Sequence, residues 1–194
     1  MRLGAALLAA GRSARFGENK LLADFAGRPM IARALETVRA VCPARAVVVT
    51  GSEQIAELAR GAGFEVCHND APELGQSHSI YLGVSALREM DALLLMVADQ
   101  PLLSGASLAG LMTAFARSGK GMACLCDRTH RGNPAVFSPV YYDALCALHG
   151  DGGAKPILRA HEEDLLVVPC AGEDELADAD TPQALETLRQ RMRN

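Results

Sequence analysis

Short apolar runs alternate with amphipathic helical patterns along the chain. The runs predict strands over Leu3–Ala9, Arg45–Thr50, Phe64–Cys67 and Ala92–Ala98. The last of these runs is continuously apolar, which is typical of a strand that helices cover on both faces. A fifth strand is expected over Gly121–Cys126.

Apolar positions at helical spacing lie between the predicted strands. Three stripes have this spacing: Met30, Ile31, Ala34, Leu35, Val38 and Val41; Ile80, Val84 and Leu87; and Leu108, Leu111, Met112 and Phe115. Ser104 is placed to cap the third helix, and Thr181-Pro182 predicts the start of a last one. This alternation indicates an α/β fold of three αβα layers around a mostly parallel, Rossmann-like sheet. The least regular stretch, from Cys126 to Gly153, is interpreted as an excursion of the same domain toward substrate.

Length and composition fit one globular domain. A chain of 194 residues is of single-domain size, so we expect residues 1–194 to form one domain. The mild acidity, 19 Lys+Arg against 23 Asp+Glu, gives no electrostatic footprint for nucleic acid or an anionic membrane. The apolar N-terminus runs straight into a glycine-rich loop, so we interpret it as a buried strand rather than a signal peptide. We therefore expect a cytoplasmic protein with neither nucleic acid nor membrane as a partner.

The six cysteines are scattered and contain no C-x-x-C pair. This spacing predicts neither a zinc site nor a disulfide framework. Cys124 and Cys126, one residue apart in a predicted strand, are expected to pack as small hydrophobes.

The loop after the first predicted strand has the composition of a polyphosphate-binding loop. Gly11 and Gly17 allow tight turns, while Arg12, Arg15 and Lys20 supply three cations within nine positions. Backbone amides and cations together can surround phosphate oxygens. The spacing is not that of a Walker A loop, and the chain contains no G-x-G-x-x-G dinucleotide fingerprint. The alternative is a solvated loop with surface cations.

Carboxylates follow two other segments. Asp99 directly follows the Ala92–Ala98 run, where it is placed either to hold a hard cation such as Mg²⁺ or to cap a turn. Asp178 and Asp180 lie two apart and would point the same way in an extended segment. One of the two is expected to bind metal, the other to be solvated or to cap the last helix.

Small polar residues follow at Gly75, Ser77 and Ser79, a set suited to hydrogen-bonding a base or a ribose. Ser77 is equally suited to be the N-cap of the helix through Leu87. His78 is not assigned to a hydrolytic triad, because no G-x-S-x-G elbow accompanies it.

With these loops in place, the whole chain resembles nucleotidyltransferases of the molybdenum cofactor cytidylyltransferase type. The first loop matches their L-A-A-G-x-S-x-R-x-G-x-x-K-L-L motif, apart from Phe16 where methionine is usual. The G-x-S-x-S segment from Gly75, Asp99-Gln100-Pro101 and Asp180-Thr181-Pro182 follow in the order of that family. Two segments of the acceptor half also match but depart at one position each: Asn133 replaces histidine in an R-G-H-P segment and Lys155 replaces arginine in a G-D-x-G-A-R segment. Lysine lacks the bidentate fork that arginine offers a phosphate, and both departures fall in the half of the chain that the resemblance assigns to the acceptor.

The resemblance implies a nucleotidyltransferase fold and a set of roles. Nucleotide-binding positions would be Leu8, Ala9, Ala10, Gly11, Arg12, Lys20, Gly75, Ser77 and Ser79. Catalytic residues would be Lys20, Arg15 and Asp99; Asp99 and Asp180 would hold Mg²⁺; and Gln100, Asn133 and Lys155 would contact the acceptor. The implied reaction transfers CMP from CTP to the terminal phosphate of Mo-molybdopterin, releasing pyrophosphate. The implied protein partner is a molybdenum hydroxylase or its maturation factor.

Two other readings stay open at this point. One is a nucleotidyltransferase with another nucleotide or acceptor: GTP, or a sugar or isoprenoid phosphate. The other is a non-catalytic carrier that hands molybdopterin to a hydroxylase. A carrier has no need of a metal–triphosphate site, so pyrophosphate release separates the carrier from the enzymes.

Overall fold

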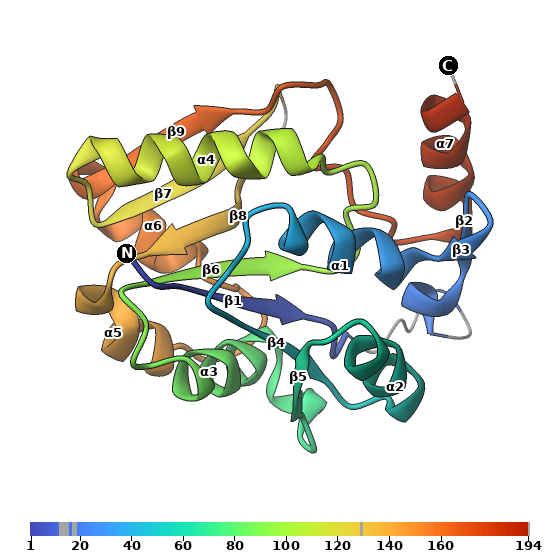
Figure 1. The fold of residues 1–194 in the computed structure, drawn as a ribbon, viewed down its shortest axis with the longest axis horizontal. Coiled ribbons are helices and arrows are strands. Elements are labelled where there is room, and N and C mark those ends of the chain that lie inside the picture. The colour runs from blue at the N-terminus through green and yellow to red at the C-terminus, as the bar shows by residue number, and fades with distance from the viewer. Residues whose placement is uncertain (12–15, 17–18, 129, 194) are drawn as a thin grey trace.

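The computed structural model describes residues 1–11, 16, 19–128 and 130–193 (Figure 1). A seven-stranded sheet has the order β5-β4-β1-β6-β8-β7-β9. Its strands are β1 (Leu3–Leu8), β4 (Arg45–Thr50), β5 (Glu65–His68), β6 (Ala92–Val97), β7 (Met122–Cys126), β8 (Arg131–Phe137) and β9 (Leu165–Pro169). All pairings within the β5-β4-β1-β6 half are parallel, as is β7 with β9, whereas β8 runs antiparallel to both of its neighbours.

Helices cover both faces of this sheet. They are α1 (Met30–Arg39), α2 (Glu53–Gly61), α3 (Gln76–Ala86), α4 (Gly105–Ser118), α5 (Tyr142–Cys146), α6 (Lys155–Ala160) and α7 (Pro182–Arg193). Single 3₁₀ turns span Lys20–Leu22, Pro72–Leu74, Pro139–Tyr141 and Glu162–Asp164, and a small hairpin pairs β2 (Asp24–Phe25) with β3 (Arg28–Pro29).

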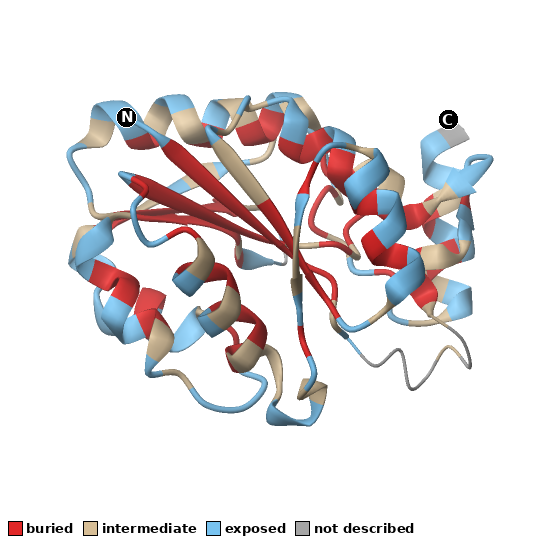
Figure 2. Ribbon diagram, turned by 60° about the horizontal axis from the view of Figure 1, so that its bottom comes forward, coloured by how far each residue is buried: buried red, intermediate tan, exposed pale blue. Residues whose placement is uncertain are grey.

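Alternate side chains of the strands supply two separate apolar layers. Leu7 and Leu94 pack on one face, in a cluster with residues of α1, α2, α4 and α7. Leu8 and Leu95 point to the other face, toward residues of α3, α5 and α6. Figure 2 shows the buried strands between the two helical layers. The predicted three-layer αβα fold with a mostly parallel sheet is confirmed.

All five predicted strands are confirmed to within one residue at either end. The three helical stripes correspond to α1, α3 and α4. Ser104 caps α4, because its Oγ accepts a hydrogen bond from Ser107 N at 3.1 Å. Thr181 Oγ1 likewise accepts from Ala184 N, at 3.1 Å, where α7 begins. Cys124 is fully buried in the core, as expected, while Cys126 is half-buried.

The interpretation of residues 126–153 as an irregular excursion is wrong in part, because β8 lies in the middle of the sheet between β6 and β7. Pro134 cannot donate to a strand ladder, and it falls where the β7–β8 register shifts, between the pairings of Cys124 and Cys126. The apolar part of β8 is confined to Ala135–Phe137, too short to stand out as a strand pattern. The other strand of the seven-stranded sheet that the sequence does not predict, β9, lies at its edge.

Among the described residues, no helix combines the length and the apolar character needed to span a membrane. The division of the chain into a single domain over residues 1–194 stays a prediction.

Candidate active site

Two adjoining pockets, each of about 530 Å³, open at the carboxyl ends of β1 and β6. Ligands of open α/β sheets bind at this edge. The first pocket contacts the segment after β1 and the start of α3, and the second lies between β6, β8 and the residues before α6. The two pockets share Leu8, Gln76, Val97, Asp99, Asp151 and Asp180.

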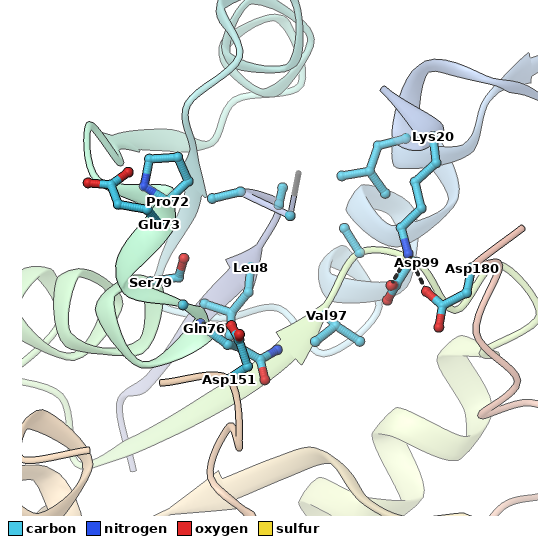
Figure 3. Close-up of a pocket in the computed structure, with 16 residues that line it drawn as sticks. Leu8, Lys20, Pro72, Glu73, Gln76, Ser79, Val97, Asp99, Asp151 and Asp180 are labelled. Carbon is cyan, nitrogen blue, oxygen red and sulfur yellow. Dashed lines mark hydrogen bonds and ion pairs between the residues drawn. The ribbon is translucent and has the colours of Figure 1, made fainter. Parts of the chain in front are cut away.

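A lysine bridges two aspartates where the pockets meet. Lys20 Nζ lies 2.6 Å from Asp99 Oδ2 and 2.7 Å from Asp180 Oδ1 (Figure 3). These distances are those of charge-assisted hydrogen bonds. The lysine side chain is 11% exposed, against 21% for Asp99 and 56% for Asp180. Three positions that the sequence predicts as functional therefore meet at one point, with Asp180 rather than Asp178 opposite Asp99.

Two hydrogen bonds hold the backbone segments that carry these three side chains. Asn19 Oδ1 accepts a hydrogen bond from Leu21 N and so caps the 3₁₀ turn that carries Lys20. Asp99 lies two residues after the end of β6, and its carbonyl accepts a hydrogen bond from Ala179 N at 2.9 Å. That bond ties the segment before α7 to the end of β6, which places Asp180 beside Asp99.

The electrostatics of the bridge keep Lys20 charged. Burial by itself lowers the pKa of the Lys20 ammonium, but the charges and hydrogen bonds of Asp99 and Asp180 outweigh burial and raise it above 10.5. Asp99 Oδ1, the other oxygen of that carboxylate, is buried and has no hydrogen-bond partner among the described residues. A buried carboxylate oxygen without a partner is costly in a site that holds only protein atoms.

The donor set fits a hard divalent cation that also takes ligands from substrate. Within the described part of the chain, no group of three or more His, Cys, Asp or Glu side chains is placed to hold a metal. Mg²⁺ is commonly bound by one or two carboxylates, with water and substrate phosphates completing its shell. Asp99 and Asp180 form such a pair of carboxylates. Asp99 Oδ1, which has no hydrogen-bond partner in the described part of the chain, would be a further ligand atom for a cation bound there.

The first loop is described only in part. Arg12 and Arg15, both predicted to bind phosphate, lie outside the described residues. Leu8, Ala9, Ala10 and Gly11 line the first pocket together with Lys20. The Ala9 amide is already used, since it donates to Val49 O at 2.8 Å. A Cβ built on Gly11 meets no atom of the described residues within 4 Å.

Gly75 and Ser79 line the first pocket. Figure 3 shows Ser79 on the side of the pocket away from Lys20. Ser79 Oγ accepts a hydrogen bond from Asn69 Nδ2 at 2.9 Å. Gly75 has φ +85°, and a Cβ there would come within 2.6 Å of Asp151 Oδ1 and of the Gly150 carbonyl carbon. Only glycine fits this conformation and this contact.

The structure separates Ser77 from the predicted group. Ser77 is not among the residues that line either pocket; its Oγ donates to Leu74 O at 3.2 Å and its amide donates to Gly150 O at 3.0 Å. The alternative that Ser77 is the N-cap of α3 is wrong, because the helix begins one residue earlier, with Gly75 at the cap position. Ser77 holds the start of α3 against the loop at Gly150.

A chain of amide contacts runs along one wall of the second pocket. Gln100 Nε2 donates to Asp178 Oδ1 and to Leu176 O, each at 3.0 Å. Gln100 Oε1 accepts from Asn133 Nδ2 at 2.8 Å, and Asn133 Oδ1 accepts from Val97 N at 3.2 Å. Partial burial of its carboxylate, and then the negative charge of Asp99, raise the pKa of Asp178. Two of the three predicted acceptor contacts, Gln100 and Asn133, therefore lie side by side and bond to each other.

Lys155, the third predicted acceptor contact, lies exposed on the rim of the second pocket at the start of α6. Two more basic residues that sequence reasoning left without a role, His130 and Arg131, line the same pocket. Arg131 is paired with Glu162 at 2.9 Å. Since Glu162 already holds Arg131, Lys155 is the better placed of these two cations to meet an anionic ligand.

Asp151 was not singled out from the sequence, although it lines both pockets. Its Oδ1 accepts a hydrogen bond from Gln76 N at 3.1 Å, so it caps α3 from a loop 75 residues away. The available signal was the G-D-x-G-A segment, which resembles a family motif at the position of Asp151.

The MobA-like NTP transferase domain matches residues 5–165. The chain belongs to the MobA-like NTP transferase family. It is therefore an enzyme of the nucleotidyltransferase class.

Two curated relatives differ in how much of their length is matched. Purine catabolism protein PucB of Bacillus subtilis is 28% identical over 204 aligned positions, which cover 95% of each chain. Bifunctional protein GlmU of Pelobacter propionicus is 36% identical over 146 residues, 73% of this chain. The chain spans only 31% of that GlmU protein.

Three solved structures superpose on nearly the whole chain. A nucleotidyl transferase from Methanothermobacter has a TM-score of 0.84 at 25% identity, over 97% of this chain and 96% of that one. Rv0371c of Mycobacterium tuberculosis, solved in complex with manganese, has a TM-score of 0.79 at 20% identity, over 98% and 99%. A CMP:2-keto-3-deoxy-manno-octonic acid synthetase complexed with CTP has a TM-score of 0.78 at 14% identity, over 100% and 99%. The last two likenesses show the fold alone.

Proposed function

We propose that this enzyme transfers CMP from CTP to the terminal phosphate of a phosphorylated pterin, Mo-molybdopterin, and releases pyrophosphate. The observation that carries the proposal is the meeting of Lys20, Asp99 and Asp180 where the two pockets join. One pocket then takes the nucleotide and the other the acceptor, with the charged residues at the point where phosphate must pass between them. Residues 1–194 act in this scheme as one cytoplasmic domain.

The charge of the first pocket supports a nucleotide bound together with a cation. Four carboxylates line that pocket, from Glu73, Asp99, Asp151 and Asp180, and Lys20 is the single cation that lines it within the described residues. A triphosphate would be repelled by this surface unless further positive charge came with it. We assign Asp99 and Asp180 as the residues that would hold Mg²⁺, which when bound neutralises charge on the α-phosphate and on the departing pyrophosphate.

The residues of the chain would do the remaining work by position and charge. Lys20 would move from the aspartates to a phosphate oxygen, and Arg12 and Arg15 would supply further cations to the triphosphate. The acceptor phosphate is already ionised at neutral pH, so no side chain need take a proton from it. Catalysis of this kind rests on alignment of the reacting groups and on electrostatic stabilisation of the transition state.

The choice of CTP is supported by the small residues opposite Lys20. In Figure 3, Gln76 and Ser79 lie on the side of the pocket away from Lys20 and the two aspartates. Gly75 and Ser79 both line this pocket, so a base bound there would lie near backbone and hydroxyl groups. The Leu-Ala-Ala-Gly and Asp-Gln-Pro sequences also resemble those of cytidylyltransferases. A base that leaves buried polar groups without partners is strongly rejected, so a clear preference among nucleotides is expected.

The acceptor and partner are proposed from the second pocket and from one relative. Lys155 on the rim offers a cation to an acceptor phosphate, and Asn133 presents an amide on the wall. The relative matched over 95% of both chains is named a purine catabolism protein. A molybdenum hydroxylase that acts on purines, or its maturation factor, is accordingly the proposed recipient of the product.

The decisive experiment measures pyrophosphate release with CTP, GTP, ATP or UTP at equal Mg²⁺, with and without Mo-molybdopterin, and identifies the product by mass. We expect release only with acceptor and metal, and at least a tenfold preference for CTP, a discrimination within reach of one set of base contacts. Lys20→Ala should lower turnover by about 10² or more, as loss of other transition-state donors does. A tenfold preference for GTP would replace CTP in the proposal, and a folded Lys20→Ala enzyme with unchanged turnover would remove Lys20 from the mechanism.

A further inference from the structure

The two carboxylates assigned to the metal already hold a cation from the chain itself. Lys20 Nζ makes its short contacts to Asp99 Oδ2 and Asp180 Oδ1, one oxygen from each carboxylate. Figure 3 shows the lysine side chain reaching across to both aspartates. An ammonium and a divalent ion repel each other strongly at such separations, so both cannot share these two oxygens.

The Lys20 ammonium can leave the two aspartates without a movement of the backbone. Its backbone belongs to the capped 3₁₀ turn Lys20–Leu22, whereas its charge sits at the end of a flexible four-carbon stem. The ammonium can therefore move between ligands without a change in the backbone. The first pocket, which Lys20 lines, has room for such a movement.

We propose that Lys20 is the resident counter-ion of the metal site, and that it yields Asp99 and Asp180 to a divalent cation only when a polyphosphate takes up its ammonium. The inference rests on the proposed function in taking these aspartates as metal ligands. Metal without nucleotide must displace the Lys20 ammonium from both aspartates with no phosphate to take it up. Metal that arrives with a nucleotide brings that anion, so the two are loaded together.

The exchange of the Lys20 ammonium for a divalent cation on Asp99 and Asp180 predicts opposite effects of one substitution on nucleotide and on metal. Removal of the Lys20 charge should weaken nucleotide binding but tighten the binding of metal alone. A lysine that served only as a phosphate ligand would leave the affinity for metal alone unchanged. The sign of this second effect is therefore the test.

Binding of Mn²⁺ alone can be measured from the electron paramagnetic resonance signal of the free ion, which is lost on binding. Lys20→Met keeps an apolar stem without the charge, and Lys20→Gln serves as a second neutral variant in case the first does not fold. We expect both to bind Mn²⁺ about tenfold more tightly than the wild type, the scale of one nearby charge removed from a partly buried site. Lys20→Arg, which keeps the charge, should bind as weakly as the wild type.

The matched control is Lys120→Met, because Lys120 lies on the surface and donates to Glu163 O, away from both pockets. Its affinity for Mn²⁺ should equal that of the wild type. Added CTP should tighten Mn²⁺ binding more in the wild type than in Lys20→Met. Neutral Lys20 variants that bind Mn²⁺ no more tightly than the wild type would overturn the proposal, as would tight binding by Lys20→Arg. Tighter binding by the neutral variants, with no turnover of any nucleotide by the wild type, would uphold the exchange and refute the proposed reaction.

Discussion

Replacement of Gln100 by leucine is the sharpest test of how the site is held together. The Gln100 side chain is buried, and its amide makes three hydrogen bonds, to Leu176 O, Asp178 Oδ1 and Asn133 Nδ2. It thus ties the segment that carries Asp178 to the end of β6 and to β8. Gln100→Leu keeps a side chain of similar size and removes all three bonds.

The cost can be worked from the surroundings of each partner. The Leu176 carbonyl belongs to a fully buried residue and would be left without a donor, at about 1–3 kcal/mol. Asp178 and Asn133 line the second pocket, where water can reach them, so each lost bond costs roughly 0.5 kcal/mol. Burial of the leucine side chain returns about 1 kcal/mol. The net loss is about 2 kcal/mol, which for a chain of this length lowers the Tm by roughly 4–8 °C.

Thermal and urea unfolding measure this loss, with Gln183→Leu on an exposed position of α7 as the control. The control should change the free energy of unfolding by less than about 0.5 kcal/mol. Gln100→Glu adds a second arm: its carboxylate would face Asp178, so its Tm deficit should be larger at pH 7 than at pH 5. A Gln100→Leu protein with the wild-type Tm, or a Gln100→Glu deficit independent of pH, would refute the role given to this amide.

Three further predictions concern the pocket and its surroundings. Asp99→Asn and Asp180→Asn should each abolish pyrophosphate release. The double variant should lose little more turnover than either single variant, because the effects of residues that act on one metal do not add. Losses of turnover that add fully in the double variant would show that the two residues act separately. Gly75→Ala should lower the Tm by about 5 °C or more, because a side chain at φ +85° is strained and its Cβ would lie 2.6 Å from the Gly150 carbonyl carbon. A melting curve like that of the wild type would contradict this close contact. Burial and a hydrogen bond to Asp164 raise the pKa of Tyr141 to about 12, so the folded protein keeps a proton that the unfolded chain loses near pH 10. The free energy of unfolding should therefore fall as pH rises from 10 to about 12, and it should fall less steeply in Tyr141→Phe. Urea unfolding at several pH values measures both slopes, and equal slopes for the two proteins would disprove this.

The sheet was largely predictable because its central strands carry a strong local signal. The Ala92–Val97 strand is apolar throughout, and such a run has few alternatives to a strand covered on both faces. Residues that follow parallel strands gather at one edge, so the neighbourhood of Lys20 and Asp99 also followed from the pattern. The ion pairs themselves could not be predicted from the sequence. They join residues 79 and 160 positions apart, and no local pattern specifies which carboxylate a lysine contacts.

The strand and the site residue that the sequence mispredicted depend on contacts between residues far apart in the chain. β8 carries a glycine and a proline at Gly132 and Pro134, which mask a strand whose partners lie elsewhere in the chain. Ser77 and Ser79 are indistinguishable by residue type, but they lie two residues apart on α3 and so face different sides of the helix. The burial of Ser77 against Gly150 depends on a loop 73 residues further along the chain, which composition alone does not locate.

The bond between Lys20 and Asp180 spans 160 positions, and this separation has a consequence for the newly made protein. During synthesis the segment after β1 emerges early, whereas the aspartate that completes the bridge emerges only after β9. A nascent chain that has built most of the sheet still lacks one side of the charged centre. If Asp180 helps to hold the metal, as proposed, such a chain lacks a metal ligand. Stabilisation by metal and nucleotide together would then begin only once the segment before α7 has joined the end of β6.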